Sequence, residues 1–305
     1  GGRGNSIVSS GNSACPHSPC IDNIMSLAKG TVMRKGPEAS GDGTRGRWHA
    51  GPLAGVLVLL CLVALSRGSL DTPLAEVLKV LLERAGMGAW AGEVDARIST
   101  VVWEIRLPRV LVAIGVGAAL ATAGACLQGL FRNPLADPGL IGVSSGGAIG
   151  SILAISSLGW LPGLSGWAAA IHVPLWAMAG SMLATIVVYR VARIAGKTHI
   201  STLLLAGIAV NALAGAIVGA VLYTSDNDAL RRFTFWTLGS LHTTTWQTVG
   251  LMAPFIILPL LVLPRYRTAL NAFLLGEAEA YHLGFNTQVV KRIVVGLCAV
   301  MVGVT

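Results

Sequence analysis

Residues 106–150, RLPRVLVAIGVGAALATAGACLQGLFRNPLADPGLIGVSSGGAIG, decide the fold of this chain, because two apolar runs meet there at a hinge broken by proline. A helix needs about 20 apolar residues to cross a bilayer, and each run reaches or approaches that length. The hinge, Asn133-Pro134-Leu135-Ala136-Asp137-Pro138-Gly139, cannot be continuous helix, since proline lacks the amide donor and clashes with the preceding turn. The stretch therefore predicts a helical hairpin in a membrane.

The composition of the whole chain indicates the same environment. Of its 305 residues, 53% are hydrophobic and only 12% are charged, and the mean hydropathy is +0.69. A soluble domain carries about 25% charged residues, so this chain has too few charges to cover a water-soluble core. The predicted fold class is all-α, a polytopic transmembrane helical bundle.

Hydropathy also divides the chain into segments. The tail at residues 1–49 is polar and is predicted to be disordered, whereas residues 50–305 form the transmembrane domain. The apolar runs predict helices over 50–66, 108–131, 139–158, 173–191, 201–223 and 246–263, and one from Ile293 onward. The last run is too short to cross, so we expect the chain to be truncated within a seventh helix. Residues 73–84 are amphipathic, and residues 229–241 are expected to form a re-entrant or interfacial helix.

The net charge of +8 comes largely from Lys and Arg beside the apolar runs. Loops rich in these cations stay in the cytoplasm, so the distribution orients membrane helices and argues against a nucleic-acid partner. The cations before the first run, which predict a cytoplasmic N-terminus, are Arg34, Lys35, Arg45 and Arg47. The same rule places the loops after 173–191 and 246–263 in the cytoplasm.

The sequence contains no motif for catalysis or for a bound cofactor. Cys15 and Cys20 bracket His17, but no second ligand pair follows at zinc-like spacing, so no metal site is expected. The glycines of residues 142–150 lack the Lys of a phosphate-binding loop and are better explained by helix packing. A membrane enzyme is therefore disfavoured. An ion-coupled secondary transporter is disfavoured as well, since no Asp or Glu lies inside a spanning run.

Several polar residues in or beside the apolar runs have two interpretations. Gln128 and Asn211 either bond across helices or line a transport pathway. Arg106 and Arg109 either extend toward the membrane surface or present a docking pair for the carboxylates of an external partner. The residues alone leave both pairs of alternatives open.

Five motifs, in this order, resemble one family: RLPR, GAALATAGACLQGLFRNPLADPGLIGVSSGGAIG, LLLAGIAVN, FWTLGSL and LNAFLLGEAEAYHLG. They are similar to the permease subunits of type II ABC importers, which take up cobalamin, haem and ferric siderophores. The resemblance runs from about Ala50 to the end of the chain. It implies a fold of about ten helices, of which about seven are present here.

The resemblance also implies partners and a mechanism. A second permease copy forms a homodimer around a central pathway in the bacterial inner membrane, two ATPase subunits bind below it, and a periplasmic substrate-binding protein docks outside. This chain itself binds no cofactor and is not an enzyme, because ATP is used by the partner subunit. Transport then proceeds by alternating access.

The family's functional residues map onto this sequence at matching motifs. Arg106 and Arg109 correspond to arginines that hold acidic residues of the binding protein, and His199 and Ser201 fall at the cytoplasmic gate, with Gln128 and Asn211 as pathway candidates. This sequence has His-Ile-Ser at the gate instead of adjacent small hydroxyls. The ATPase-coupling helices correspond to residues 268–286, with these candidate contacts: Leu270, Asn271, Leu275, Gly276, Glu277, Glu279, Leu283 and Gly284.

The substrate is indicated less directly. The segment ALRRFTFWTLGSL is most like haem permeases, which favours haem, with a ferric siderophore or cobalamin as the alternative. Arg231, Arg232 and His242 are candidate substrate contacts. Pairing of the two arginines with Asp226 and Asp228 is the simpler explanation.

Overall fold

The computed structural model describes residues 42–68, 70–87, 94–157, 167–194, 197–242 and 244–305. The chain divides into two compact units, residues 1–58 and residues 59–305. Cys15, His17, Cys20 and most of the expected tail lie outside the described residues. Helix α2, Asp42–Ser66, begins before Ala50, so residues 42–49 are helical and the expected disordered tail is wrong there. A helix nucleated in the apolar run extends one residue at a time, so it can continue into the polar segment before that run.

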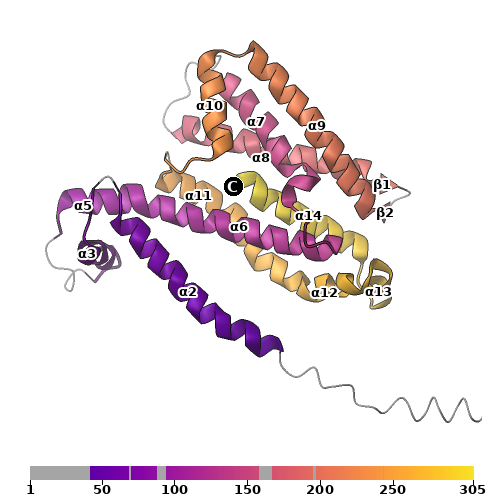
Figure 1. The fold of residues 1–305 in the computed structure, drawn as a ribbon, viewed down its shortest axis with the longest axis horizontal. Helices are drawn as coiled ribbons and strands as arrows, with labels where there is room; N and C mark the ends of the chain where they lie inside the picture. Colours follow the sequence, from indigo (N-terminus) through magenta and orange to yellow (C-terminus); the bar gives the residue numbers. More distant parts are fainter. Residues whose placement is uncertain (1–41, 69, 88–93, 158–166, 195–196, 243) are drawn as a thin grey trace, which may run out of the picture. The chain divides into compact units, whose positions relative to one another are not determined.

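The described residues include five helical segments that are long and apolar enough to cross a membrane. The first runs from Ala96 to Phe131 and joins α5 (Ala96–Thr100), the π-helix η1 (Val101–Arg106) and α6 (Leu107–Phe131). The others are α8 (Trp167–Val191), α9 (Ile200–Thr224), α11 (Trp246–Val262) continued by η4 (Leu263–Tyr266) and α12 (Arg267–Leu275), and α14 (Thr287–Val304). The bundle predicted from hydropathy is confirmed (Figure 1).

Three of the predicted segments differ from the structure. Helix α14 begins at Thr287 and reaches 18 residues, so the expectation that the last run is too short to cross is wrong. Lys291, which precedes the apolar run, bonds Glu277 and the Thr198 carbonyl inside the protein. The helix can therefore start earlier than hydropathy indicates. The apolar part of α2, Gly51–Ser66, and the helix Val143–Ser157 are too short to count among the five segments able to cross.

The hinge between α6 and α7 (Val143–Ser157) breaks the helix as its prolines predicted. Arg132 ends α6 in the left-handed region, with a φ of 52°. Asp137 then caps the 3-10 helix η2 (Pro138–Ile141), its Oδ1 accepting the Gly139 amide at 2.7 Å. Gly142, with a φ of 82°, turns the chain into α7, which explains why α7 starts at Val143 and not at Gly139.

Helices α7 and α8 pack backbone against backbone. A Cβ atom on Gly146 would collide with the carbonyl of Gly180, and a Cβ on Gly150 would collide with the carbonyl of Trp176. Small residues allow helices this close approach in a membrane. The interpretation of residues 142–150 as packing glycines is therefore confirmed.

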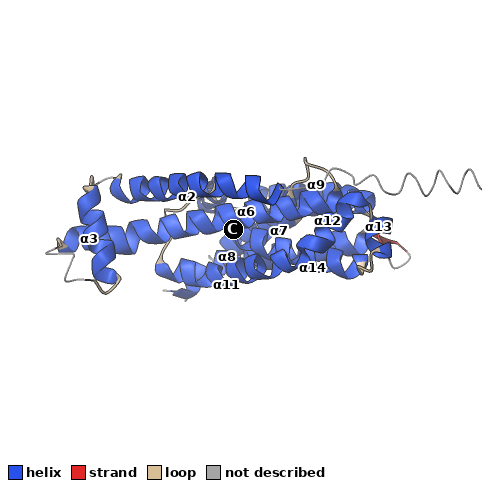
Figure 2. Cartoon of the chain, turned by 90° about the horizontal axis from the view of Figure 1, so that it is seen from below, coloured by secondary structure: helices blue, strands red, loops and turns tan. Residues whose placement is uncertain are grey.

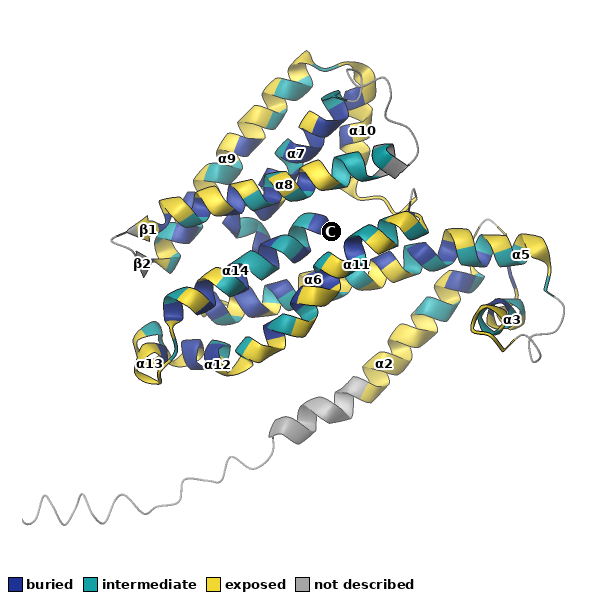
Figure 3. Ribbon diagram, turned by 180° about the vertical axis from the view of Figure 1, so that it is seen from behind, coloured by how far each residue is buried: buried dark blue, intermediate teal, exposed yellow. Residues whose placement is uncertain are grey.

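The largest apolar core joins α6, α11, α12 and α14 with parts of α8 and α9. Leu127, Phe273 and Met301 are among its fully buried side chains. One face of α9 remains exposed along its length (Figure 3), with Leu205 68% and Leu213 62% exposed.

Short elements stand at both ends of the bundle. The hairpin of β1 (Arg193–Ile194) and β2 (Lys197–Thr198) was not expected from the sequence. The hairpin and α13 (Glu277–His282) lie at the same end of the bundle (Figures 1 and 2). We call this the hinge end, because Arg132 of the hinge lies beside Gly276, its Nη1 4.0 Å from a Cβ atom built there. The amphipathic helices α3 (Leu74–Arg84) and α10 (Asn227–Leu238) confirm the two segments expected not to span.

Candidate functional site

The surface of the hinge end is built from α12 and α13. Gly276 separates the two helices with a φ of 144°, and Gly284 follows α13 with a φ of 90°. Both values are natural for glycine and strained for other residues. The exposed apolar side chains of this surface are Leu274, Leu275, Tyr281 and Leu283. Exposed apolar side chains at the end of a bundle suit contact with another protein.

The candidate coupling residues lie on this surface to different degrees. Leu275 and Leu283 are 70% and 61% exposed, and Asn271 and Glu279 are exposed as well. Leu270 packs against the core, and Glu277 turns toward α14. The structure therefore gathers the predicted set at one surface but divides it into outward-facing and inward-facing members.

Glu277 belongs to a polar network that connects three elements. Its Oε1 lies 2.6 Å from Lys291 Nζ on α14 and accepts Gln288 Nε2 at 3.2 Å. Lys291 Nζ also donates to the carbonyl oxygen of Thr198 in β2 at 2.8 Å. The Thr198 amide donates to Gln288 Oε1 at 3.0 Å, so each of the four residues bonds at least two others.

Sequence reasoning missed three members of this network: Thr198, Gln288 and Lys291. Lys291 lies before the apolar run that begins at Ile293, yet it is inside α14 and only 2% exposed. Lys291 lies four residues after Thr287 on one helix face, but the burial of both side chains is visible only in the structure, so the sequence offers no signal for this network.

The candidate gate residues begin α9, directly after the network. His199 is the N-cap of α9, and its carbonyl accepts the Leu203 amide at 2.9 Å. Its side chain and that of Ser201 are exposed at the hinge end. The structure therefore places both residues at a helix entrance next to the buried Thr198.

Asn211 bonds across helices, which was the simpler of its two interpretations. Its Oδ1 accepts Ser145 Oγ of α7 at 2.7 Å, and its Nδ2 donates to the Gly139 carbonyl at 3.1 Å. The Gln128 side chain, in contrast, is exposed near the end of α6. The two amides thus have different surroundings: Asn211 ties α9 to the hinge, and Gln128 faces outward.

Arg106 does not present its side chain to an external partner. It is 7% exposed, and Nη1 donates to the Leu65 carbonyl at 2.6 Å and to Thr72 Oγ1 at 2.8 Å. Nη2 bonds the Leu70 carbonyl, and a Cβ on Gly68 would lie 2.8 Å from Nη2. The assignment of Arg106 to a docking pair is therefore wrong: it fastens the turn between α2 and α3.

Arg106 and Arg109 bind different partners although they are only three residues apart. Proline has no amide hydrogen to bond the carbonyl four residues before it. The chain before Pro108 forms a π-helix, in which the Leu107 amide bonds the Val102 carbonyl. The Arg106 guanidinium bonds groups in the turn at residues 65–72, whereas the Arg109 guanidinium bonds the His242 carbonyl.

Arg109 lies in the first turn of α6, and this end of α6 is at the opposite end of the bundle from α13 (Figure 1). Its Nη2 donates to the His242 carbonyl at 2.8 Å, and its Nε is buried without a hydrogen-bond partner among the described residues. Close by in sequence, Trp103 and Trp246 have ring centroids 5.2 Å apart, and Trp246 Nε1 donates to the Trp103 carbonyl at 3.1 Å. Arg109 is thus partly engaged and partly accessible.

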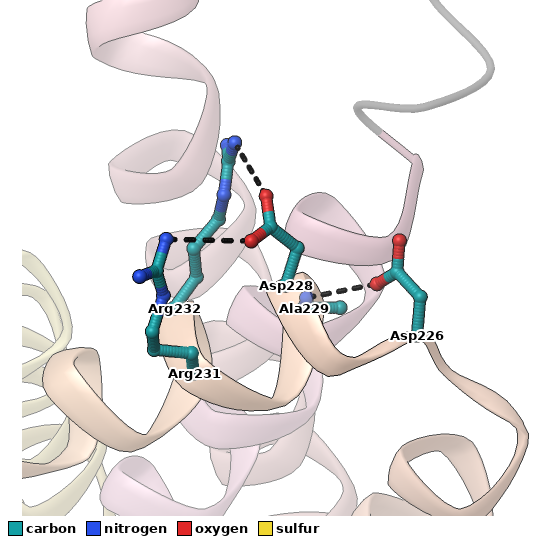
Figure 4. A network of polar contacts seen from close by, with 5 residues as sticks. All are labelled: Asp226, Asp228, Ala229, Arg231 and Arg232. Carbon is teal, nitrogen blue, oxygen red and sulfur yellow. Dashed lines mark hydrogen bonds and ion pairs between the residues drawn. The ribbon is translucent and has the colours of Figure 1, made fainter.

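The two arginines of α10 pair with an acid on their own helix. Arg231 and Arg232 lie 3.3 Å and 3.5 Å from the carboxylate oxygens of Asp228, and all three side chains are exposed (Figure 4). Asp226 instead caps α10 by accepting the Ala229 amide at 2.8 Å. Exposed pairs of this kind hold their partners weakly, at about 0–1 kcal/mol, so the arginines remain available to another anion. His242 is exposed on the segment that follows.

No group of three His, Cys, Asp or Glu within the described part of the chain could hold a metal ion. The cysteines described there, Cys61, Cys126 and Cys298, are free thiols.

The sequence is similar to known membrane transport proteins. The model of the FecCD transport family matches residues 56–305. The hemin transport system permease protein HmuU of Yersinia pestis is 44% identical over 204 residues, covering 66% of this chain and 60% of that protein. The cobalamin import system permease protein BtuC of Halobacterium salinarum is 38% identical over 201 residues, covering 66% of this chain and 52% of that protein.

Two further matches extend over more of the chain. The vitamin B12 import system permease protein BtuC of Salmonella typhi is 38% identical over 246 residues, covering 78% of this chain and 72% of that protein. A solved structure described as an inward-facing conformation of a metal-chelate type ABC transporter is 29% identical, with a TM-score of 0.66, and covers 83% of this chain and 73% of its own. The chain thus spans less than two thirds of the Yersinia and Halobacterium relatives.

Proposed function

The chain belongs to the FecCD transport family, and from this membership we propose that it is the permease subunit of an ATP-driven importer. The observation that carries the proposal is the family match over residues 56–305, which includes all five helices able to cross a membrane. The relatives named above are permease proteins of hemin, cobalamin and vitamin B12 transport. The protein is a multi-pass membrane protein of this family.

We propose that the hinge end faces the cytoplasm of a bacterium and that the protein lies in the inner membrane, with its N-terminus also inside. Arg190 lies in the last turn of α8 and Arg193 follows that helix, while Arg265 and Arg267 follow α11. Both groups stand at the hinge end, and Lys and Arg concentrate on cytoplasmic loops.

The proposed assembly contains a second permease copy, two ATPase subunits and a periplasmic substrate-binding protein. The exposed apolar surface of α12 and α13 supports contact with an ATPase subunit at the hinge end. The exposed apolar face of α9 supports a place beside lipid or the second copy. Arg109, at the opposite end, supports binding-protein docking, because guanidinium groups hold carboxylates in a defined geometry.

The proposed mechanism is alternating access without chemistry on the substrate. A loaded binding protein docks outside, and ATP draws the two ATPase subunits together. Movement of α12 and α13 then changes the entrance of α9 at His199 and Ser201. Asn211, midway along α9, lies on the proposed pathway and holds that helix to α7.

We propose haem as the substrate, with cobalamin or a ferric siderophore as the alternative. The Yersinia hemin permease is 44% identical and the cobalamin permeases are 38% identical, which supports haem. Arg231 and Arg232 are suited to the two carboxylates that haem carries, since their exposed pairs with Asp228 can exchange partners.

The test is uptake into proteoliposomes that contain the full-length protein, its ATPase and its binding protein. We expect uptake of haem that requires ATP inside and the binding protein outside. Uptake driven by an ion gradient without the ATPase would refute the importer. Parallel assays with cobalamin and a ferric siderophore decide the substrate, because ATP-dependent uptake of either without haem uptake would replace haem and leave the importer standing.

A further inference from the structure

The ammonium group of Lys291 joins two parts of the hinge end that are distant in sequence. It contacts Glu277 Oε1 at 2.6 Å and the Thr198 carbonyl at 2.8 Å. The Lys291 side chain is 2% exposed, whereas that of Glu277 is 39% exposed. A cation that is buried to this degree depends on its oxygen partners, so the contact constrains the position of all three residues.

Gln288 makes the same connection with neutral groups. It lies one helical turn before Lys291, on the same face of α14. Its Nε2 donates to Glu277 Oε1 at 3.2 Å, and its Oε1 accepts the Thr198 amide at 3.0 Å. Both the amide and the carbonyl of Thr198 are therefore bonded to α14, and Glu277 is bonded to the same two α14 residues.

Helix α13 is joined to α14 by these polar contacts at its first residue and is packed into the apolar core at Ala280. It has six residues, and the glycines on either side, Gly276 and Gly284, have positive φ values. The chain therefore changes direction at both ends of a helix too short to hold its place by its own backbone bonds. Glu277, its first residue, provides the ionic contact to α14.

Thr198 stands at the other side of the network, immediately before α9. It is 3% exposed and precedes the N-cap His199. Because His199 accepts the first backbone bond of α9 from Leu203, a shift of the Thr198 carbonyl moves the first turn of the helix.

We propose that Lys291 is a positioning residue that transmits displacement of α13 to the first turn of α9. The ammonium performs this role because it donates to the carboxylate and to the main-chain carbonyl at the same time, which links side chain to backbone across α14. The inference rests on the proposed function, which assigns ATPase contact to α13 and the pathway entrance to α9.

The first test is hydrogen exchange of the full-length protein in lipid nanodiscs. In Lys291→Met, we expect backbone amides of residues 198–203 and of residues 277–283 both to exchange about tenfold faster. In Glu277→Gln, which leaves the Thr198 contact in place, only residues 277–283 should accelerate. Arg292→Met is the matched control, since it removes an exposed cation from the adjacent position. Unchanged exchange of residues 198–203 in Lys291→Met would overturn the proposal.

A charge exchange separates the two bonds of Lys291. The double variant Glu277→Lys with Lys291→Glu restores an ion pair between α13 and α14, but a carboxylate at position 291 cannot donate to the Thr198 carbonyl. Protection of residues 277–283 should return, while residues 198–203 should stay fast. Return of protection in both segments would show that the hydrogen bond from Lys291 to the Thr198 carbonyl does not hold the first turn of α9 in place, and the proposal would fail.

The functional test adds the ATPase subunit. In the unaltered protein, ATPase binding should change exchange of residues 198–203. In Lys291→Met, binding should persist while this change is lost, and ATP hydrolysed per substrate transported should rise about tenfold. Lys291→Arg should recover coupling, because a guanidinium can also donate to both oxygens. A response at residues 198–203 that persists in Lys291→Met would refute transmission. Failure of the unaltered protein to bind the ATPase would instead count against the proposed function, and the exchange measurements on the permease alone would still decide the link.

Discussion

Arg106 and Thr72 form a buried polar contact, with Nη1 of the guanidinium 2.8 Å from the threonine hydroxyl oxygen. The same guanidinium holds carbonyl oxygens of Leu65 and Leu70, so it satisfies the turn after α2 from within the protein. A charge buried in this way stabilises the fold and is inaccessible to a docking protein.

Arg106→Ala should therefore destabilise the protein. The substitution leaves buried carbonyls without a donor, and a hydrogen bond to a charged group contributes about 1.5–3 kcal/mol, so we expect a loss of at least about 2 kcal/mol. Arg67→Ala, which removes an exposed arginine from the same turn, should change stability by no more than about 0.5 kcal/mol. Thermal unfolding of the detergent-solubilised protein measures both, and equal effects would contradict the structural role.

Arg109→Glu should weaken docking of the binding protein. The side chain stands at the end opposite α13 and is only partly engaged by the His242 carbonyl, so charge reversal changes the surface that a partner meets. Binding to the protein in nanodiscs should fall about tenfold or more, because a rim charge of like sign repels the partner's carboxylates. Assembly with the ATPase should be unaffected. Normal docking would remove Arg109 from the interface.

Asn211→Leu should loosen α9 from the hinge. The variant removes the acceptor of Ser145 and the donor to Gly139, and we expect a cost of about 1–3 kcal/mol for the polar groups left behind. Gln128→Leu is the matched control, since the Gln128 side chain is exposed. If the two variants unfold at the same temperature, the bond across helices has no energetic role.

Gly150→Ala should be poorly tolerated, because the added methyl group would overlap the Trp176 carbonyl. Forcing α7 and α8 apart costs about 1–3 kcal/mol or more. Gly117→Ala in α6, where a Cβ meets no atom within 4 Å, should be neutral or should stabilise by up to about 1 kcal/mol through helix propensity. Yield of folded protein and thermal unfolding distinguish the two variants, and a tolerated alanine at position 150 would contradict the packing.

Arg231→Gln combined with Arg232→Gln should lower haem uptake without lowering stability. The exposed pairs with Asp228 contribute about 0–1 kcal/mol, so their loss leaves the fold intact. Removal of the two cations proposed to bind the carboxylates of haem should reduce ATP-dependent uptake of haem about tenfold, in line with two lost charge-assisted contacts. Asp228→Asn, which frees both arginines, is the control and should maintain uptake. Unchanged haem uptake in the double variant would exclude the arginines as substrate contacts.

Hydropathy and proline spacing predicted most of the bundle, because both act locally along the chain. The hinge at residues 133–139, the exposed arginines of α10 and the packing role of Gly146 and Gly150 follow from such local rules. The burial of Arg106 does not, since it depends on acceptors in the turn at residues 65–72, far away in the sequence. The burial of Lys291 likewise depends on Glu277 and Thr198, which only the tertiary structure brings together.

The glycine contact between α7 and α8 limits how this protein can move. Side chains can exchange rotamers and let helices slide, but backbone atoms in direct contact have no such freedom. At Gly146, Gly150 and Gly180 there is no side chain to rearrange, so the two helices form one rigid body. Movement of this pair relative to the neighbouring helices must then be absorbed at its borders, by the hinge before α7 and the hairpin after α8. For these two helices, two short stretches of irregular backbone at the hinge end therefore take up the change of conformation.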